Sequence, residues 1–160
     1  MKLFSLFVKN NLLILTSTAY KLSEISKTYI EQLLNKISQT SSQKAFEKAL
    51  LRNDCCQFKG LVGSGLNFKI VSAFKNLDRT FLMVLDNAEQ AAYHLNDLEQ
   101  LLSTKEVLYF PASYREAYNP EATDNTNVLL RSEVLKKLSN PKQSKIIVTY
   151  PQALFEKVMS

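Results

Sequence analysis

Residues that commonly build metal, redox or catalytic sites are scarce in this sequence. Its 160 residues include one histidine, two cysteines and no tryptophan. Cys55 and Cys56 are adjacent, with no second cysteine pair and no histidine cluster to accompany them, so we expect two reduced thiols rather than a zinc site or a disulfide framework. His94 has no nucleophile at a recognisable spacing, and we expect it to be structural rather than a general base.

A long apolar run is also missing. Residues 1–20 have a basic start, an apolar part and small residues at Ser17 and Ala19, as a secretory signal does. Lys9 and the asparagines after it interrupt the apolar part, which is too short to span a membrane. We therefore predict that residues 1–40 form a helical or loose N-terminal extension of a cytoplasmic protein. Export with cleavage of the first residues is the alternative.

The main body of the chain lacks an excess of charge of either sign. Of the net charge of +5, most lies in residues 1–50, which carry seven lysines and three acidic residues. The remainder carries thirteen basic and twelve acidic residues, which is a weak electrostatic footprint for a nucleic-acid groove. The N-terminal lysines are expected to form a solvated helix face.

Apolar and polar segments alternate along residues 41–160 in a way that predicts an α/β domain with a mainly parallel sheet flanked by helices. The run Thr80 to Asp86 is continuously apolar, as is typical of a parallel strand covered on both faces. Asn87 suits the N-cap of the helix after it, and Pro151 suits the first turn of the last helix. Strands are expected over 55–60, 80–86, 106–111 and 144–150, and helices over 20–52 with a polar break at 38–43, and over 66–77, 87–102, 126–138 and 151–159.

The segment "GLVGSGLN" resembles a phosphate-binding loop, G-x-x-x-x-G-K-[ST], that has lost two working residues. Gly60 and Gly65 have the loop's spacing, but Leu66 replaces the lysine and Asn67 replaces the hydroxyl that holds magnesium. Backbone N–H groups of the remaining loop residues could still wrap a phosphate. We predict a degenerate loop that closes a strand onto a helix, with no nucleotide cofactor and no catalysis; its residues are Gly60, Gly63, Ser64, Gly65, Leu66 and Asn67.

No carboxylate in the sequence completes such a site convincingly. Asp86 ends an apolar strand, but Asn87 follows where a second acid would help. Asp97 and Glu99 lie two residues apart on one predicted helix, so their side chains point in different directions. They are predicted to be solvated charges rather than a catalytic pair.

The longest irregular segment, residues 111–125, is the second candidate for function. It holds Tyr114, Arg115 and Tyr118 close together, and long loops of this kind often bind partners. These side chains suit stacking on a base or on a partner protein. Packing of the loop against the edge of the sheet is the alternative, which we favour.

Several segments in the same order resemble the N-terminal region of bacterial transcription-repair coupling factors. They are "LVGSGLNF", "DNAEQAAYHLNDLEQLL", "VLYFPASYREAYNPEATDNTNVLLRSEVL" and "IIVTYPQALFEKV", within residues 45–159. The region is also similar, more distantly, to the helicase subunit of the excision-repair nuclease. The aromatic hairpin that follows that subunit's tyrosine-rich motif is absent here, but the motif itself is matched by Tyr114, Tyr118, Pro120, Glu121 and Ala122.

The resemblance implies a degenerate P-loop helicase-like domain that serves as a non-catalytic structural and interaction module in transcription-coupled nucleotide excision repair. In that family the partners are the excinuclease DNA-binding subunit, RNA polymerase and DNA, and they bind mostly through modules beyond this region. The motor also lies downstream, so no enzyme activity and no membrane partner is expected for this chain. The alternative is a nucleotide- or DNA-binding fragment akin to the helicase subunit.

Overall fold

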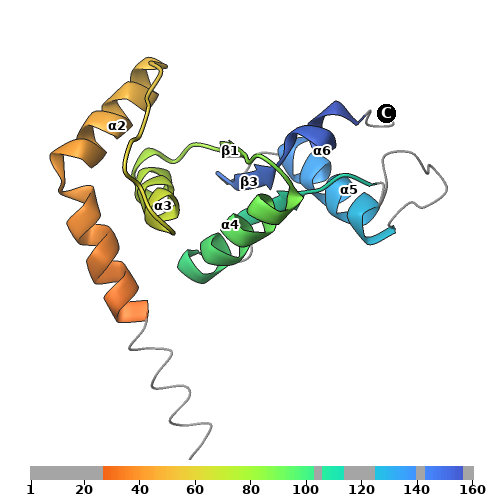
Figure 1. The fold of residues 1–160 in the computed structure, drawn as a ribbon, viewed down its shortest axis with the longest axis horizontal. Helices are drawn as coiled ribbons and strands as arrows, with labels where there is room; N and C mark the ends of the chain where they lie inside the picture. Colours follow the sequence, from red (N-terminus) through yellow and green to blue (C-terminus); the bar gives the residue numbers. More distant parts are fainter. Residues whose placement is uncertain (1–26, 103–105, 114–124, 140–142, 157–160) are drawn as a thin grey trace, which may run out of the picture.

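A small parallel sheet with helices around it forms the body of the protein (Figure 1). The computed structural model describes residues 27–102, 106–113, 125–139 and 143–156. Residues 27–38 are helical. The elements that follow are α2 (Ser41–Arg52), α3 (Gly65–Leu77), β1 (Phe81–Val84), α4 (Ala88–Leu101), β2 (Val107–Phe110), α5 (Asn125–Ser139), β3 (Ile146–Thr149) and α6 (Pro151–Phe155).

The three strands run parallel in the order β1-β3-β2. Ile146 of β3 stands opposite Phe81 of β1 and Val107 of β2. All four residues of β3 are buried, because the last strand in the sequence occupies the middle of the sheet. The predicted α/β class with a parallel sheet is confirmed. The predicted strand over residues 55–60 is wrong, since this stretch has no regular structure.

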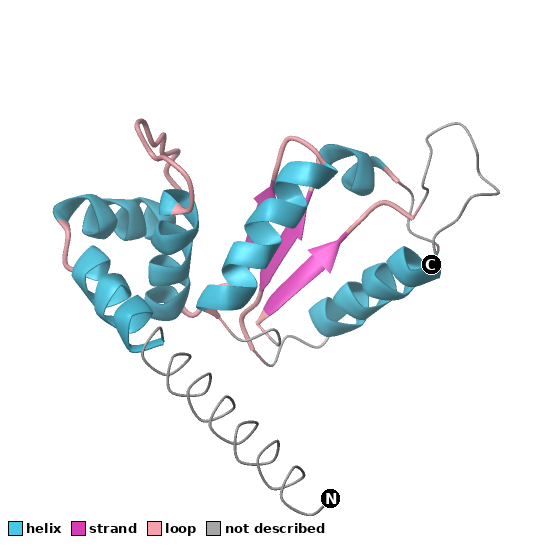
Figure 2. Cartoon of the chain, turned by 60° about the horizontal axis from the view of Figure 1, so that its bottom comes forward, coloured by secondary structure: helices cyan, strands magenta, loops and turns pink. Residues whose placement is uncertain are grey.

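The two crossover helices cover opposite faces of the sheet. The chain moves from β1 past β3 to β2 through α4, and then returns to β3 through α5. Right-handed crossovers that travel in opposite directions place their helices on opposite faces. In Figure 2, α4 lies in front of the sheet and α5 lies beside its right-hand strand, and α5 contacts β2.

Strand β1 is covered on one face only. Met83 is buried, whereas Leu82 and Val84, which point to the other face, are 57% and 49% exposed. The expectation that this apolar run is covered on both faces is therefore wrong. Helix α5 covers that face over β2, and within the described residues no helix reaches over β1 there.

Local signals in the sequence set the ends of the helices. The Asn87 side chain accepts a hydrogen bond from the Gln90 backbone N–H at 2.9 Å, which confirms the predicted N-cap of α4. Pro151 is the first residue of α6, as predicted. Ala91 and Leu98 of α4 are fully buried in the core, in agreement with the helical spacing of the apolar residues.

Helix α2 joins the body mainly through polar contacts. Thr40 caps the helix by accepting from the Gln43 backbone N–H at 3.2 Å. The buried Gln43 side chain donates to Glu47 and to the Lys69 carbonyl oxygen of α3, each at 3.0 Å. Leu34, within the helical residues 27–38, is buried in the same hydrophobic core as the sheet. No helix in the described ranges is long and apolar enough to cross a membrane.

Candidate functional site

The glycine-rich segment forms an irregular loop that ends at α3. Gly60 and Gly63 have φ values of 76° and 55°, in the region that side chains disfavour, although the space beside each is open. Glycine is therefore needed at these two positions for the backbone conformation. The loop opens a helix, as a phosphate-binding loop does, but no strand precedes it.

A chain of four hydrogen-bonded polar side chains links this loop to α4. The Ser64 hydroxyl donates to Asp97 Oδ2 at 2.5 Å, and the Asn67 side-chain amide donates to the same oxygen at 3.0 Å. Asn67 Oδ1 lies 2.8 Å from His94 Nδ1. Asn67 is fully buried, whereas His94 and Asp97 are half-buried. Asn67 therefore serves as the central link of a structural cluster.

The position of Asp97 corrects one prediction from the sequence. Its carboxylate is held beside the first turn of α3 rather than solvated, because Ser64 donates to it instead of capping its own helix. A negative charge near a helix N-terminus is favourable. Glu99 is exposed, as predicted. His94 and Asp97 are three residues apart, beside the apolar stripe of α4, which is the signal that could have revealed a half-buried pair.

An open pocket of about 410 Å³ lies over the loop, and it is lined by Phe58, Gly60, Leu61, Gly63, Leu66 and His94. None of these lining residues is a lysine or an arginine, so the pocket wall supplies no fixed positive charge. Leu66 is partly buried and packs against the hydrophobic core. The pocket therefore offers apolar side chains, backbone groups of the loop and one imidazole, but its lining residues supply no counter-charge for a phosphate.

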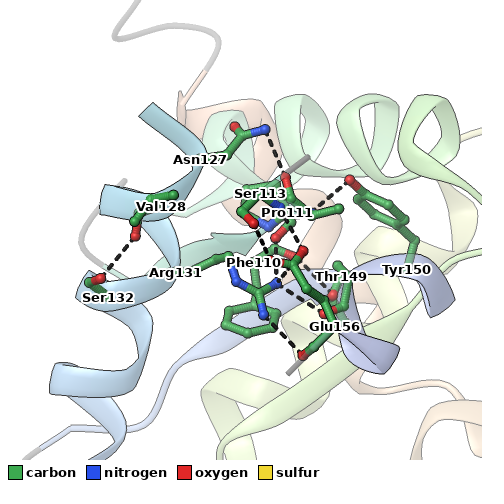
Figure 3. Close-up of polar contacts among 12 residues, drawn as sticks. Phe110, Pro111, Ser113, Asn127, Val128, Arg131, Ser132, Thr149, Tyr150 and Glu156 are labelled. Atoms are coloured by element: carbon green, nitrogen blue, oxygen red, sulfur yellow. Dashed lines mark hydrogen bonds and ion pairs between the residues drawn. The ribbon is translucent and has the colours of Figure 1, made fainter. Parts of the chain in front are cut away.

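A second cluster lies at the carboxyl ends of β2 and β3, and Arg131 of α5 is at its centre (Figure 3). Arg131 is only 6% exposed. Its guanidinium donates to the carbonyl oxygens of Pro111 at 2.7 Å and Ala153 at 2.9 Å, lies 4.2 Å from the centre of the Phe110 ring, and sits 3.7 Å from the Glu156 carboxylate. One buried cation thus ties the end of β2 to α5 and α6.

The same cluster fixes both ends of the candidate interaction loop. Glu156 accepts hydrogen bonds from the backbone N–H and the hydroxyl of Ser113, just before the loop. After the loop, Asn127 donates to the Ala112 carbonyl oxygen at 2.9 Å. The loop residues themselves, Tyr114, Arg115 and Tyr118, lie outside the described residues. The loop therefore leaves and re-enters the fold at the carboxyl edge of the sheet, where ligands bind in open α/β folds.

Two tyrosines connect this edge to the sheet. The Tyr150 hydroxyl accepts from the Ala112 backbone N–H at 2.9 Å, and the rings of Tyr109 and Tyr150 lie 6.5 Å apart. Burial and the neighbouring Tyr150 raise the pKa of Tyr109 to about 12. The Tyr109 hydroxyl is therefore neutral at physiological pH.

One curated protein gives a similarity that bears on function. The chain is 32% identical over 92 residues to the transcription-repair-coupling factor of Rickettsia bellii (strain RML369-C). This match supports a relation to transcription-repair coupling factors. It covers 57% of this chain but 8% of that protein, so the chain corresponds to a small part of it. No family profile and no solved structure matches the chain.

The structure brings together some of the residues that the sequence singles out and leaves others apart. Ser64 and Asn67 join one cluster with His94 and Asp97, whereas Leu66 stays outside it, packing against the core and lining the pocket over the loop. Cys55 and Cys56 are free and exposed. Within the described ranges no group of three or more His, Cys, Asp or Glu side chains is arranged to hold a metal ion. Reasoning from the sequence did not identify Arg131 as a buried residue. The available signal was a single arginine inside the apolar run "NVLLRSEVL".

Proposed function

We propose that this chain is a non-catalytic structural and interaction module related to the N-terminal region of transcription-repair coupling factors, acting in transcription-coupled nucleotide excision repair. The similarity to the Rickettsia bellii protein supports the repair context. The hydrogen bonds from Ser64 and Asn67 to Asp97 are the observation that carries the non-catalytic part, because they place a carboxylate beside the loop where a nucleotide's phosphates would bind.

The electrostatics of the loop oppose nucleotide binding. At about 5 Å and an effective dielectric constant of about 20, a carboxylate repels each phosphate charge by about 3 kcal/mol. Leu66 supplies no charge to offset this repulsion, and Asn67 is committed to Asp97 and His94. The helix N-terminus alone attracts an anion only weakly. We therefore propose that the loop keeps its shape to connect elements of the fold and binds no nucleotide.

The alternative, a nucleotide- or DNA-binding fragment akin to the excinuclease helicase subunit, has less support. The chain beyond residue 50 has nearly balanced charge, so only weak, salt-sensitive contact with DNA is expected. The partners that the family resemblance implies are the excinuclease DNA-binding subunit, RNA polymerase and DNA. A cytoplasmic location follows from the same proposal.

Two measurements test the proposed function separately. Calorimetric titration with magnesium-ATP should give no saturable binding tighter than about millimolar, which corresponds to roughly −4 kcal/mol. Micromolar binding would contradict the non-catalytic proposal. Deletion of the gene in its own cell should slow removal of ultraviolet lesions from the transcribed strand of an active gene, while repair of the other strand is unchanged. Equal repair rates with and without the gene would contradict the role in coupled repair.

A further inference from the structure

The outer edge of β2 lies at the bottom of a groove between the two crossover helices. Helix α4 forms one wall and α5 forms the other, since the two helices cover opposite faces of the sheet. The groove has a volume of about 230 Å³, and it is lined by Leu95, Glu99, Val107, Leu108, Tyr109, Leu130, Glu133, Val134 and Lys137. Its lining is mostly apolar, and its charged side chains, Glu99, Glu133 and Lys137, come from both helices.

Some backbone N–H and C=O groups at the bottom of this groove have no hydrogen-bond partner among the described residues. Strand β2 pairs with β3 on one side, and the Ile146 N–H donates to the Glu106 carbonyl oxygen at 2.9 Å. Because partners alternate along a parallel pair, Leu108 faces β3 and the N–H and C=O groups of Val107 and Tyr109 point outward. No described residue pairs with these outward groups, although Val107 is only 4% exposed. Such groups are normally paired in a folded protein.

The shape of the groove limits what can pair with this edge. A second copy of the chain presents its own β2 between its own helices, so the helices would collide before the two edges could meet. A single extended peptide has no such flanking elements. It can enter the groove, pair with Val107 and Tyr109, and place alternate side chains against Leu95 of α4 and Val134 of α5.

The charges at the groove favour a basic peptide. Glu133 is already paired with Lys137, whose Nζ lies 2.5 Å from its carboxylate. Glu99, on the opposite wall, is exposed and has no such partner within the described residues. A lysine or arginine on the incoming strand would meet this free carboxylate.

We propose that the β2 edge is a docking site for an extended segment of a partner protein, which adds as a further strand and carries apolar side chains together with a lysine or arginine. This inference names the surface through which the proposed interaction module would act and so rests on that function. Binding of this kind draws its affinity from main-chain hydrogen bonds and its specificity from alternate side chains.

The test is selection of binders from a phage-displayed library of random peptides of about ten residues, long enough for one strand. The selected peptides should alternate apolar residues and include lysine or arginine. The best one, synthesised and added to the purified chain, should slow hydrogen exchange of the Val107 and Tyr109 amides. The same peptide N-methylated at the alternate backbone nitrogens that would face β2 should not bind. Failure to select any peptide that binds below about 100 µM, or exchange protection confined to other amides, would overturn the proposal.

A charge reversal tests the predicted basic residue without disturbing the strand. Glu99→Lys should weaken binding of the selected peptide by about two- to fivefold, as expected for an exposed ion pair. Replacing the peptide's basic residue by glutamate should restore binding to this variant. Glu89→Lys, the same change on α4 but outside the groove, should leave affinity unchanged. Equal effects of the two variants would overturn the role of Glu99. These readouts need neither nucleotide nor DNA repair, so they succeed or fail independently of the two tests of the proposed function.

Discussion

Restoring the missing residues of the phosphate-binding loop should damage the fold rather than create a nucleotide site. The double variant Leu66→Lys, Asn67→Thr gives the loop the complete G-x-x-x-x-G-K-T pattern. In this protein, however, Leu66 packs against the core and Asn67 is fully buried. Both positions already have structural roles that the new side chains cannot fill.

The expected loss of stability follows from these contacts. Asn67 donates to the Asp97 carboxylate through its amide nitrogen and bonds to His94 through its amide oxygen. The shorter threonine side chain has a single polar atom in place of these two, so we expect it to keep at most one of the bonds. Losing a hydrogen bond to a charged group costs about 2 kcal/mol. Removing the partly buried leucine side chain costs roughly 1 kcal/mol more. The introduced lysine would also be attracted to Asp97, which would neutralise the charge meant for a phosphate.

Thermal melts followed by circular dichroism and titration with a fluorescent ATP analogue test this prediction. A loss of about 3 kcal/mol should lower the melting temperature by about 10 °C, and no magnesium-dependent binding should appear. The control, Leu61→Lys with Val62→Thr, introduces the same residue types at exposed positions of the same loop and should stay within about 0.5 kcal/mol of wild type. A double variant as stable as wild type that binds the analogue at micromolar concentration would refute the reasoning.

Three further predictions concern the sheet. Arg131→Met should lower the free energy of unfolding in urea by about 3 kcal/mol, because two buried carbonyl oxygens lose their donor. Leu82→Ser should lower the free energy of unfolding by less than about 0.5 kcal/mol and Met83→Ser should lower it by about 3 kcal/mol, since only Met83 is buried. The fold raises the pKa of Tyr109 from 10.0 to about 12 and so favours the neutral phenol. The contribution of Tyr109 to the free energy of unfolding should therefore be fully present below pH 10 and should fall by up to about 2 kcal/mol by pH 12. Tyr109→Phe should abolish this loss.

Elements with a strong local signal were predictable from the sequence. The helix α4 has a side-chain cap at Asn87 and apolar residues at helical spacing, and both features appear in the structure as expected. The strand predicted at Cys55 had no such support. A few apolar residues before a glycine turn suit a strand only if a sheet offers them a partner, and here the segment passes outside the sheet instead.

The polar clusters could not be predicted because their members are far apart in the sequence. Asp97 reaches Ser64 across 33 residues, and Arg131 reaches Pro111 across 20. Each of these residues, taken alone, is of a type that is common on protein surfaces. Only the packing of α4 and α5 against the sheet turns its side chain inward. A lone charged residue beside an apolar stripe is therefore a better indicator of such clusters than a motif.

The strands β1 and β3 show why an apolar run does not reveal a position in the sheet. "FLMV" and "IIVT" are both short and mostly apolar, yet the first is an edge strand with Leu82 exposed and the second is fully buried in the centre. The difference arises from the order of the strands, because β3 inserts between two strands formed from earlier parts of the chain. That order leaves the outer backbone groups of Val107, between α4 and α5, without a strand partner in the described part of the chain. The same topology that hides the last strand thus creates the edge at which we expect a partner to dock.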